Sequence, residues 1–220
     1  EEVITHAKGK GLYVIADIKR GDIGTTATAY AEGWLGTTRV GETDCAAFDA
    51  DCVTLNGYMG SDAIKPFLDQ CVARNKSAFV LAKTSNPSSV ELQDMVAGDR
   101  VVYTVMGDLI ERWGKDTAGK YGYNALGAVV GATHPSVLKE LRRRLEHTFF
   151  LVPGYGAQGG TAADVRCAFD ELGRGAIVNA SRSIMCAWKK TGKDGMDYQE
   201  AARAAAEQMR DELREYITIL

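Results

Sequence analysis

The chain of 220 residues has 45% apolar and 25% charged residues, a composition typical of a globular protein and a length typical of one large α/β domain. Its formal net charge of -3 excludes a broad basic surface for nucleic acid, so an anionic ligand would have to be held by a few placed groups. No apolar run reaches the roughly 18 residues of a membrane span, so none is expected.

Six short apolar segments alternate with segments of helical periodicity along the chain. The expected strands are residues 12–16, 52–55, 78–82, 125–130, 149–152 and 176–179. The expected helices are residues 27–35, 61–74, 91–95 with 103–113, 135–145, 162–172 and 198–217. Strands that are apolar on both faces, each followed by a helix, predict a parallel sheet covered by helices.

Polar or glycine-rich loops follow the expected strands, among them DIKRGD, KTSNP, PGYGAQGG and NASRS. A (β/α)8 TIM barrel builds its active site from such loops around a ring, whereas a doubly wound sheet binds ligands at one switch point, so we favour the barrel. A barrel has eight strands, and the opening EEVITHAKGKG resembles a helix end closed by Gly9 or Gly11. We therefore expect residues 1–220 to form a single partial barrel domain that lacks the first two βα units, which were either removed or are supplied by a separate chain.

Four charges gather where the first expected strand ends, in the stretch DIKRGD. Asp17 and Lys19 point to the same side of an extended strand because side chains alternate, and Asp22 follows just beyond. One interpretation is a solvated ion network. The other is a proton donor: a lysine flanked by carboxylates keeps its proton, and carboxylates beside a substrate anion favour the loss of that anion's charge.

The stretch PGYGAQGG at 153–160, with SRSI at 181–184, follows the last two expected strands. Its glycines let the backbone approach a ligand, Gln158 adds an amide, and Arg182 adds a planar fork suited to phosphate. A glycine-rich loop alone is also typical of a plain turn. Its place after the last strands, where barrels commonly bind phosphate, favours a phosphate site.

The five cysteines are scattered, without a CxxC pair and odd in number. This pattern indicates reduced thiols that fill the core of a cytoplasmic protein rather than a disulfide framework.

Six motifs in this order resemble the orotidine 5′-monophosphate decarboxylase family, in its longer bacterial-type branch: DIKRGDIGTT, VTLNGYMG, KTSNP, VVGATHP, LVPGYGAQGG and NASRSI. The resemblance runs over nearly the whole chain. It implies a (β/α)8 barrel, a homodimer with shared active sites, no cofactor, and conversion of orotidylate to uridylate with release of carbon dioxide in pyrimidine biosynthesis.

The same resemblance assigns catalytic roles to the first motif. Lys19 would protonate C6 of the pyrimidine as the carboxylate departs, and Asp17 would sit against that carboxylate. Asp22 would reach into the partner subunit's site, where Thr26 would contact the ribose. The family's second network lysine and its ribose-binding aspartate come from the two strands that this chain lacks.

The remaining carried-over residues would bind the nucleotide. Ser85 matches the serine that contacts the pyrimidine. Gln158 and Arg182 match the family's phosphate-binding residues, with Pro153 nearby.

Catalysis by Lys83 or His134 and metal binding are less favoured by the residues. Lys83 is interpreted as a positioning or ion-pair residue, His134 as a helix cap, and no metal site is expected because His6 and His147 lack ligands at suitable spacing. Two alternatives stay open: a magnesium-dependent phosphosugar decarboxylase or synthase with a related Asp-x-Lys-x-x-Asp strand end, and a non-catalytic phosphate-ligand binding fragment.

Overall fold

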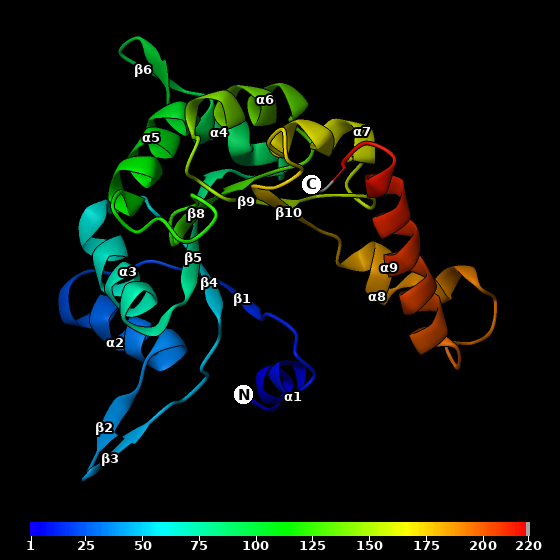
Figure 1. Cartoon of the computed structure of the whole chain (residues 1–220). Coiled ribbons are helices and arrows are strands. Elements are labelled where there is room, and N and C mark those ends of the chain that lie inside the picture. Colours follow the sequence, from blue (N-terminus) through cyan, green and yellow to red (C-terminus); the bar gives the residue numbers. More distant parts are fainter. Residues whose placement is uncertain (219–220) are drawn as a thin grey trace.

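The computed structural model describes residues 1–218, and its centre is one curled parallel sheet (Figure 1). Six strands follow the order β1-β4-β5-β8-β9-β10. Their bounds are β1 Ile15–Arg20, β4 Cys52–Leu55, β5 Ser77–Lys83, β8 Leu126–Val130, β9 Phe150–Pro153 and β10 Ala176–Asn179. Every neighbouring pair is parallel, so all six carboxyl ends meet at one edge of the sheet.

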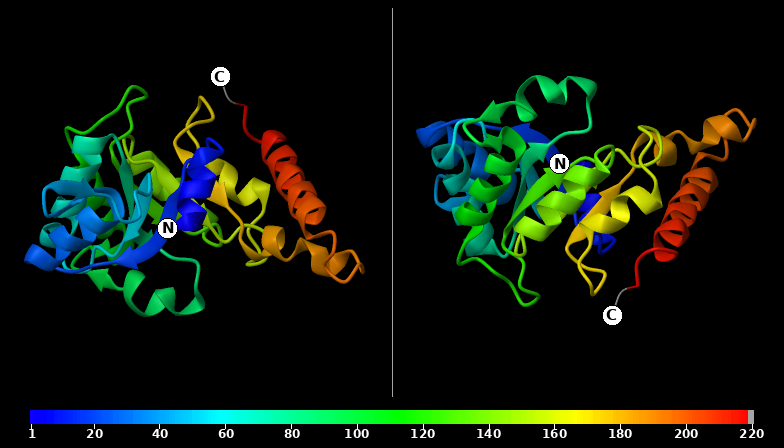
Figure 2. Two further views of the ribbon diagram at one scale, coloured as in Figure 1. Left: turned by 90° about the horizontal axis from the view of Figure 1, so that it is seen from below. Right: turned by 90° about the horizontal axis from the view of Figure 1, so that it is seen from above.

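Helices connect the strands, and the longer ones between strands pack against the convex face of the sheet. They are α1 Glu2–Gly9, α2 Gly24–Leu35, α3 Ser61–Arg74, α4 Val90–Gln93, α5 Val102–Gly114, α6 Pro135–Arg144, α7 Ala162–Val165, α8 Arg182–Met185 and α9 Tyr198–Arg214. The two views of Figure 2 place α9 at the end of the molecule opposite α2 and α3.

Side chains of the strands alternate between two apolar clusters. The larger cluster joins strand residues such as Val53 and Val80 to helix residues such as Phe67 and Ile110. The smaller cluster lies on the concave face and consists of the intervening strand residues Cys52, Phe79, Val129 and Leu151. Period-two alternation thus builds both the helix-covered core and the lining of the half-barrel.

The predicted parallel α/β architecture is confirmed, but within residues 1–218 the sheet does not close into a barrel. β1 and β10 each pair with one neighbour only, and the concave-face residue Ile177 on β10 is 43% exposed. Of the predicted elements, 52–55, 61–74 and 176–179 match the observed bounds. The domain expectation ran to residue 220, so its last two residues lie outside the described part.

Four predicted elements differ from the observed bounds by three residues or more. The last helix, expected at 198–217, ends at Arg214. The first strand was expected at 12–16 but runs over Ile15–Arg20, because Leu12 and Tyr13 are apolar yet exposed. The helix expected at 162–172 is α7 followed by a 3₁₀ turn at Arg166–Ala168. The helix expected to start at residue 27 begins at Gly24.

Two short hairpins escaped the sequence prediction. β2 (Thr38–Val40) pairs with β3 (Thr43–Cys45) in a ribbon that projects from the body, and β6 (Val96–Ala97) pairs with β7 (Arg100–Val101) (Figure 1). All residues of the β2–β3 ribbon are exposed. The expectation that all five cysteines fill the core was therefore wrong for Cys45, which lies on this ribbon, whereas Cys52 and Cys71 are buried.

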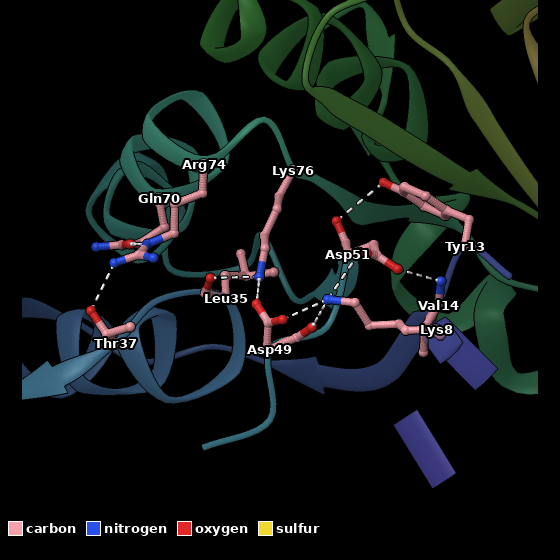
Figure 3. A network of polar contacts seen from close by, with 10 residues as sticks. All are labelled: Lys8, Tyr13, Val14, Leu35, Thr37, Asp49, Asp51, Gln70, Arg74 and Lys76. Atoms are coloured by element: carbon pink, nitrogen blue, oxygen red, sulfur yellow. Dashed lines mark hydrogen bonds and ion pairs between the residues drawn. The ribbon is translucent and has the colours of Figure 1, made fainter. Parts of the chain in front are cut away.

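A polar network fastens α1 to the body at the amino-terminal edge of the sheet (Figure 3). Lys8 Nζ contacts Asp49 Oδ2 at 2.6 Å and Asp51 Oδ1 at 3.3 Å. Lys76 Nζ reaches Asp49 Oδ1 at 2.5 Å and donates to the carbonyl of Leu35 at 2.8 Å. Partial burial raises the pKa of Asp49, but the hydrogen bonds from Lys76 and Lys8 outweigh it and hold that pKa below its usual value.

Over residues 1–218, no helix has the length and apolar character that crossing a membrane requires.

Candidate active site

A cavity of about 740 Å³ opens at the carboxyl edge of the sheet. Its concave wall is formed by Ile15, Leu81, Val129 and Leu151, the last two of which belong to the smaller apolar cluster. Its polar lining comes from strands β1, β4 and β10, from helix α4, and from the segments that follow β5, β9 and β10. The polar residues are Asp17, Lys19, Thr54, Thr84, Ser85, Asn86, Gln93, Tyr155, Gln158, Asn179, Ser181 and Arg182. This is the edge at which βα loops carry function in barrels.

Asp17 and Lys19 form an ion pair within this lining. Lys19 Nζ lies 2.5 Å from Asp17 Oδ2 and 2.6 Å from Oδ1, and both side chains are more than half exposed. Partial desolvation raises the pKa of Asp17, but hydrogen bonds from Lys19 and Thr54 and the ammonium charge together lower it below its ordinary value. The site therefore holds a carboxylate and an ammonium side by side, facing open space.

The expected proximity of Asp17 and Lys19 is observed, although the strand between them is not regular. β1 shifts register between Ala16 and Arg20, and Lys19 has a φ of 47°. Simple alternation therefore does not explain why the two side chains meet; a bulge brings them together.

Ser85 lies on the loop after β5, where three chain segments approach closely. A Cβ built on Gly131 would lie 2.9 Å from the Ser85 backbone nitrogen. A Cβ on Gly154, whose φ is +99°, would lie 2.8 Å from Gln158 Oε1 and 3.2 Å from Ser85 Cβ. Glycine at both positions lets the loops carrying Ser85 and Gln158 meet at one wall of the cavity.

Gln158, Pro153 and Arg182 line the part of the cavity beyond β9 and β10. Among the described residues, the Arg182 guanidinium has no hydrogen-bond or ion-pair partner, so its fork is available to an anion. The glycine-rich loop folds back on itself through a bridge between Tyr155 and Gly160. Tyr155 donates to Glu212 Oε2, which ties this loop to α9.

The cavity therefore collects six of the eight residues predicted for the site: Lys19, Asp17, Ser85, Pro153, Gln158 and Arg182. Asp22 and Thr26 lie outside its lining. Asp22 accepts a hydrogen bond from the Ile23 amide at 2.8 Å, and Thr26 is exposed in the first turn of α2. The roles assigned to all eight residues remain predictions.

Several lining residues were missed from the sequence. Thr54 gave a usable signal, because it is the one hydroxyl in the otherwise apolar strand β4. Gln93 gave none, since it reaches the cavity only because α4 folds back over β5: its Oε1 accepts from the Thr84 amide at 2.9 Å.

Lys83 forms an ion pair, as expected. Its Nζ lies 2.6 Å from Asp94 Oδ1 and 3.2 Å from Ser89 Oγ, and its side chain is 1% exposed.

His134 occupies the N-cap position of α6, as predicted, but its side chain makes no capping hydrogen bond. Burial and the nearby Lys83 charge lower the pKa of His134. Within residues 1–218, no three His, Cys, Asp or Glu side chains are grouped as metal ligands.

Comparison with known proteins identifies the family. Residues 1–193 match the family model described as "Orotidine 5'-phosphate decarboxylase / HUMPS family". An orotidine 5'-phosphate decarboxylase of Rhodopirellula baltica is 45% identical over 217 residues, covering 97% of this chain and 71% of that protein. One from Caldicellulosiruptor bescii is 40% identical, covering 97% and 69%. The structure of Leishmania donovani OMP decarboxylase aligns with a TM-score of 0.74 at 32% identity, covering 97% of this chain and 73% of that one. The chain belongs to the orotidine 5'-phosphate decarboxylase / HUMPS family.

Proposed function

We propose that this chain decarboxylates orotidine 5′-monophosphate to uridine 5′-monophosphate, a step of pyrimidine biosynthesis, without a cofactor. The observation that carries the proposal is a single cavity that holds the Asp17–Lys19 pair and also the unpaired Arg182 and the Gln158 amide. Curated relatives at 40% and 45% identity are named for this activity, which favours it over a phosphosugar reaction. We infer a cytoplasmic location because all five cysteines are free thiols.

Lys19 is the proton donor in this proposal. The bond between C6 of the pyrimidine and its carboxylate breaks, carbon dioxide leaves, and the electron pair that stays on C6 takes a proton from the Lys19 ammonium. Asp17, already ionised beside Lys19, faces the substrate carboxylate and raises the energy of that anion, while the same charge is relieved once carbon dioxide forms. Solvent then restores the proton to the lysine.

In this proposal the loops after β5, β9 and β10 bind the nucleotide. Arg182 and Gln158 hold the phosphate, with Pro153 at the start of the same loop, and Ser85 contacts the pyrimidine ring. The close approach at Gly154 supports this division, because the Ser85 and Gln158 side chains both lie next to this glycine. Phosphate binding at a distance from C6 can then be used to hold the ring against Lys19.

The assembly proposed for the active enzyme is a homodimer with shared sites. Asp22 and Thr26 lie outside the cavity of their own chain, which suits a role in the site of a second copy. Residues 1–220 form one catalytic domain in this proposal. The unpaired edges of β1 and β10 are completed by two further βα units, either upstream of this segment or on a separate chain, and these supply the second lysine of the charge network.

The test measures turnover of orotidylate with and without a chelator of divalent cations. The uridylate formed is separated and quantified by chromatography. The proposal expects turnover that the chelator leaves unchanged. Absence of orotidylate turnover, together with chelator-sensitive turnover of a phosphosugar acid, would favour the magnesium-dependent phosphosugar class. Binding of uridylate without turnover, both alone and with the complementing βα units added, would favour a non-catalytic phosphate-binding fragment.

A further inference from the structure

Thr54 occupies the middle of β4 and is 1% exposed, the same burial as a core residue. Its hydroxyl makes two hydrogen bonds, both to β1. It donates to Asp17 Oδ1 at 2.8 Å and accepts from the Lys19 backbone amide at 3.0 Å. One oxygen atom is thus shared by the two residues that form the ion pair.

The β1 bulge lies opposite Thr54. Ala16 pairs with Val53 and Arg20 pairs with Leu55, so β1 advances four residues where β4 advances two. The ladder therefore offers the Lys19 amide no backbone partner in β4 at this point, and Lys19 takes a left-handed φ of 47° that is unfavourable for a residue with a Cβ. The Thr54 hydroxyl receives that amide.

We propose that Thr54 is the positioning residue of the site: its hydroxyl holds the β1 bulge in the conformation that keeps the Lys19 ammonium against the Asp17 carboxylate. This inference rests on the proposed function, because it assigns to Thr54 the placement of the proton donor. The hydroxyl fixes the backbone of one residue and the carboxylate of the other. The Asp17 carboxylate cannot leave this position, and the Lys19 backbone cannot rearrange, without breaking a bond to Thr54.

The contrasting view is that Thr54 only fills space in β4. A valine has nearly the shape of threonine and favours strands, so it would fill the same space and satisfy that view. It would leave the Lys19 amide without an acceptor and Asp17 with one donor fewer. The two views therefore make different predictions for the loss of one atom, the Thr54 hydroxyl oxygen.

The experiment compares Thr54→Val and Thr54→Ser with Thr104→Val as the matched control. Thr104 is also buried, and its hydroxyl donates at 2.7 Å to the Val101 carbonyl, outside the cavity lining. Amide hydrogen exchange at Lys19 should become about tenfold faster in Thr54→Val relative to the control and stay near wild type in Thr54→Ser. NMR titration should show a raised pKa for Asp17 in Thr54→Val, since a hydrogen bond to its carboxylate is lost.

Activity should follow the same pattern. In Thr54→Val we expect kcat for orotidylate to fall about 10- to 100-fold, because the Lys19 ammonium is misplaced. KM should stay within about threefold of wild type, because the phosphate-binding residues Arg182 and Gln158 are unchanged. Thr54→Ser should recover kcat to within about threefold, and Thr104→Val should keep it. If Thr54→Val does not fold, Thr54→Ala against Thr54→Ser repeats the comparison without the added methyl group.

Unchanged exchange at Lys19 in the variants without a hydroxyl would overturn the inference, and so would faster exchange with an unchanged kcat. If wild-type protein fails to turn over orotidylate, the proposed function fails, but Lys19 exchange and Asp17 titration still decide whether Thr54 positions the pair.

Discussion

Lys83 and Asp94 form an ion pair in which the lysine side chain is 1% exposed and the carboxylate is 41% exposed. The pair joins the end of β5 to the residue that follows α4, across the base of the loop that carries Ser85. Because the two groups differ so much in burial, removing one or the other has unequal effects.

Asp94→Asn should destabilise the protein by about 3 kcal/mol, because it leaves a buried ammonium without its counter-charge. Lys83→Met should have a smaller effect, since methionine suits the apolar surroundings and Asp94 can be hydrated. Urea denaturation of both variants checks the order. Asp69→Asn, in an exposed pair with Lys65, is the control and should change stability by less than about 1 kcal/mol. A larger loss for Lys83→Met would contradict the argument.

Lys19→Ala should abolish decarboxylation in an otherwise folded protein, because a methyl group cannot donate a proton. Activity within about tenfold of wild type, ~1.4 kcal/mol in the barrier, would rule out Lys19 as the donor. Lys65→Ala removes an exposed lysine that is not part of the cavity lining and should keep full activity. Uridylate binding, measured by calorimetry, shows whether the Lys19 variant retains its site.

Arg182→Ala should weaken uridylate binding by about 2–4 kcal/mol, because a charge-assisted contact to the phosphate is lost. Binding of uridine, which has no phosphate, should not change. Arg203, on α9 and 80% exposed, provides a control for the loss of one positive charge. Equal losses for uridine and uridylate would show that Arg182 supports the fold of the loop and does not grip phosphate.

Mixing Lys19→Ala protein with Asp22→Ala protein should restore activity if sites are shared across a two-fold axis. In the heterodimer one site receives both defects and the other receives neither, so about a quarter of wild-type sites reappear after random exchange at equal amounts. Native mass spectrometry confirms the exchange. Heterodimers that form without recovering activity would place Asp22 in the site of its own chain.

Asp170 gives a prediction for the pH dependence of stability. Burial raises its pKa, but hydrogen bonds from Tyr123 and from the Arg174 and Leu172 amides outweigh this, so the pKa in the folded protein lies below its ordinary value. Its contribution is therefore present above the unfolded pKa of about 3.9 and is lost as pH falls through the folded value. The free energy of unfolding, measured by denaturation at a series of pH values from neutral to about 3, should decrease less steeply with falling pH for Asp170→Asn than for wild type.

The sequence predicted the fold best where local chemistry and packing agree. β4 and β10 are short apolar runs bounded by polar turns. α3 ends at Arg74, because the next residue, Asn75, has a φ of 54° and caps the helix in the left-handed conformation. β1 was misplaced because hydrophobicity marks burial, whereas this strand continues into charged residues that face the cavity. The β2–β3 ribbon is exposed throughout, so it carries no periodic signal.

The site was predicted as far as chemistry is visible in short motifs. DIKRGD and PGYGAQGG gave the charged and glycine-rich parts of the cavity. Gln93 was not found because its importance comes from its contact with Thr84, 9 residues away. Thr54 was visible as the one hydroxyl in β4, but its partner Asp17 lies 37 residues away, so its role was not. Asp22 and Thr26 lie outside the cavity lining, and the role assigned to them depends on a second copy of the chain.

The bond between Tyr155 and Glu212 has a consequence for how the protein is made. These residues are 57 positions apart, and Glu212 lies near the end of α9. During synthesis on the ribosome, β1 with Lys19 and the loop with Ser85 emerge long before α9, the helix that secures the glycine-rich loop. The nascent chain can therefore form the Asp17–Lys19 pair early, but the glycine-rich loop gains this anchor only when translation has passed residue 212.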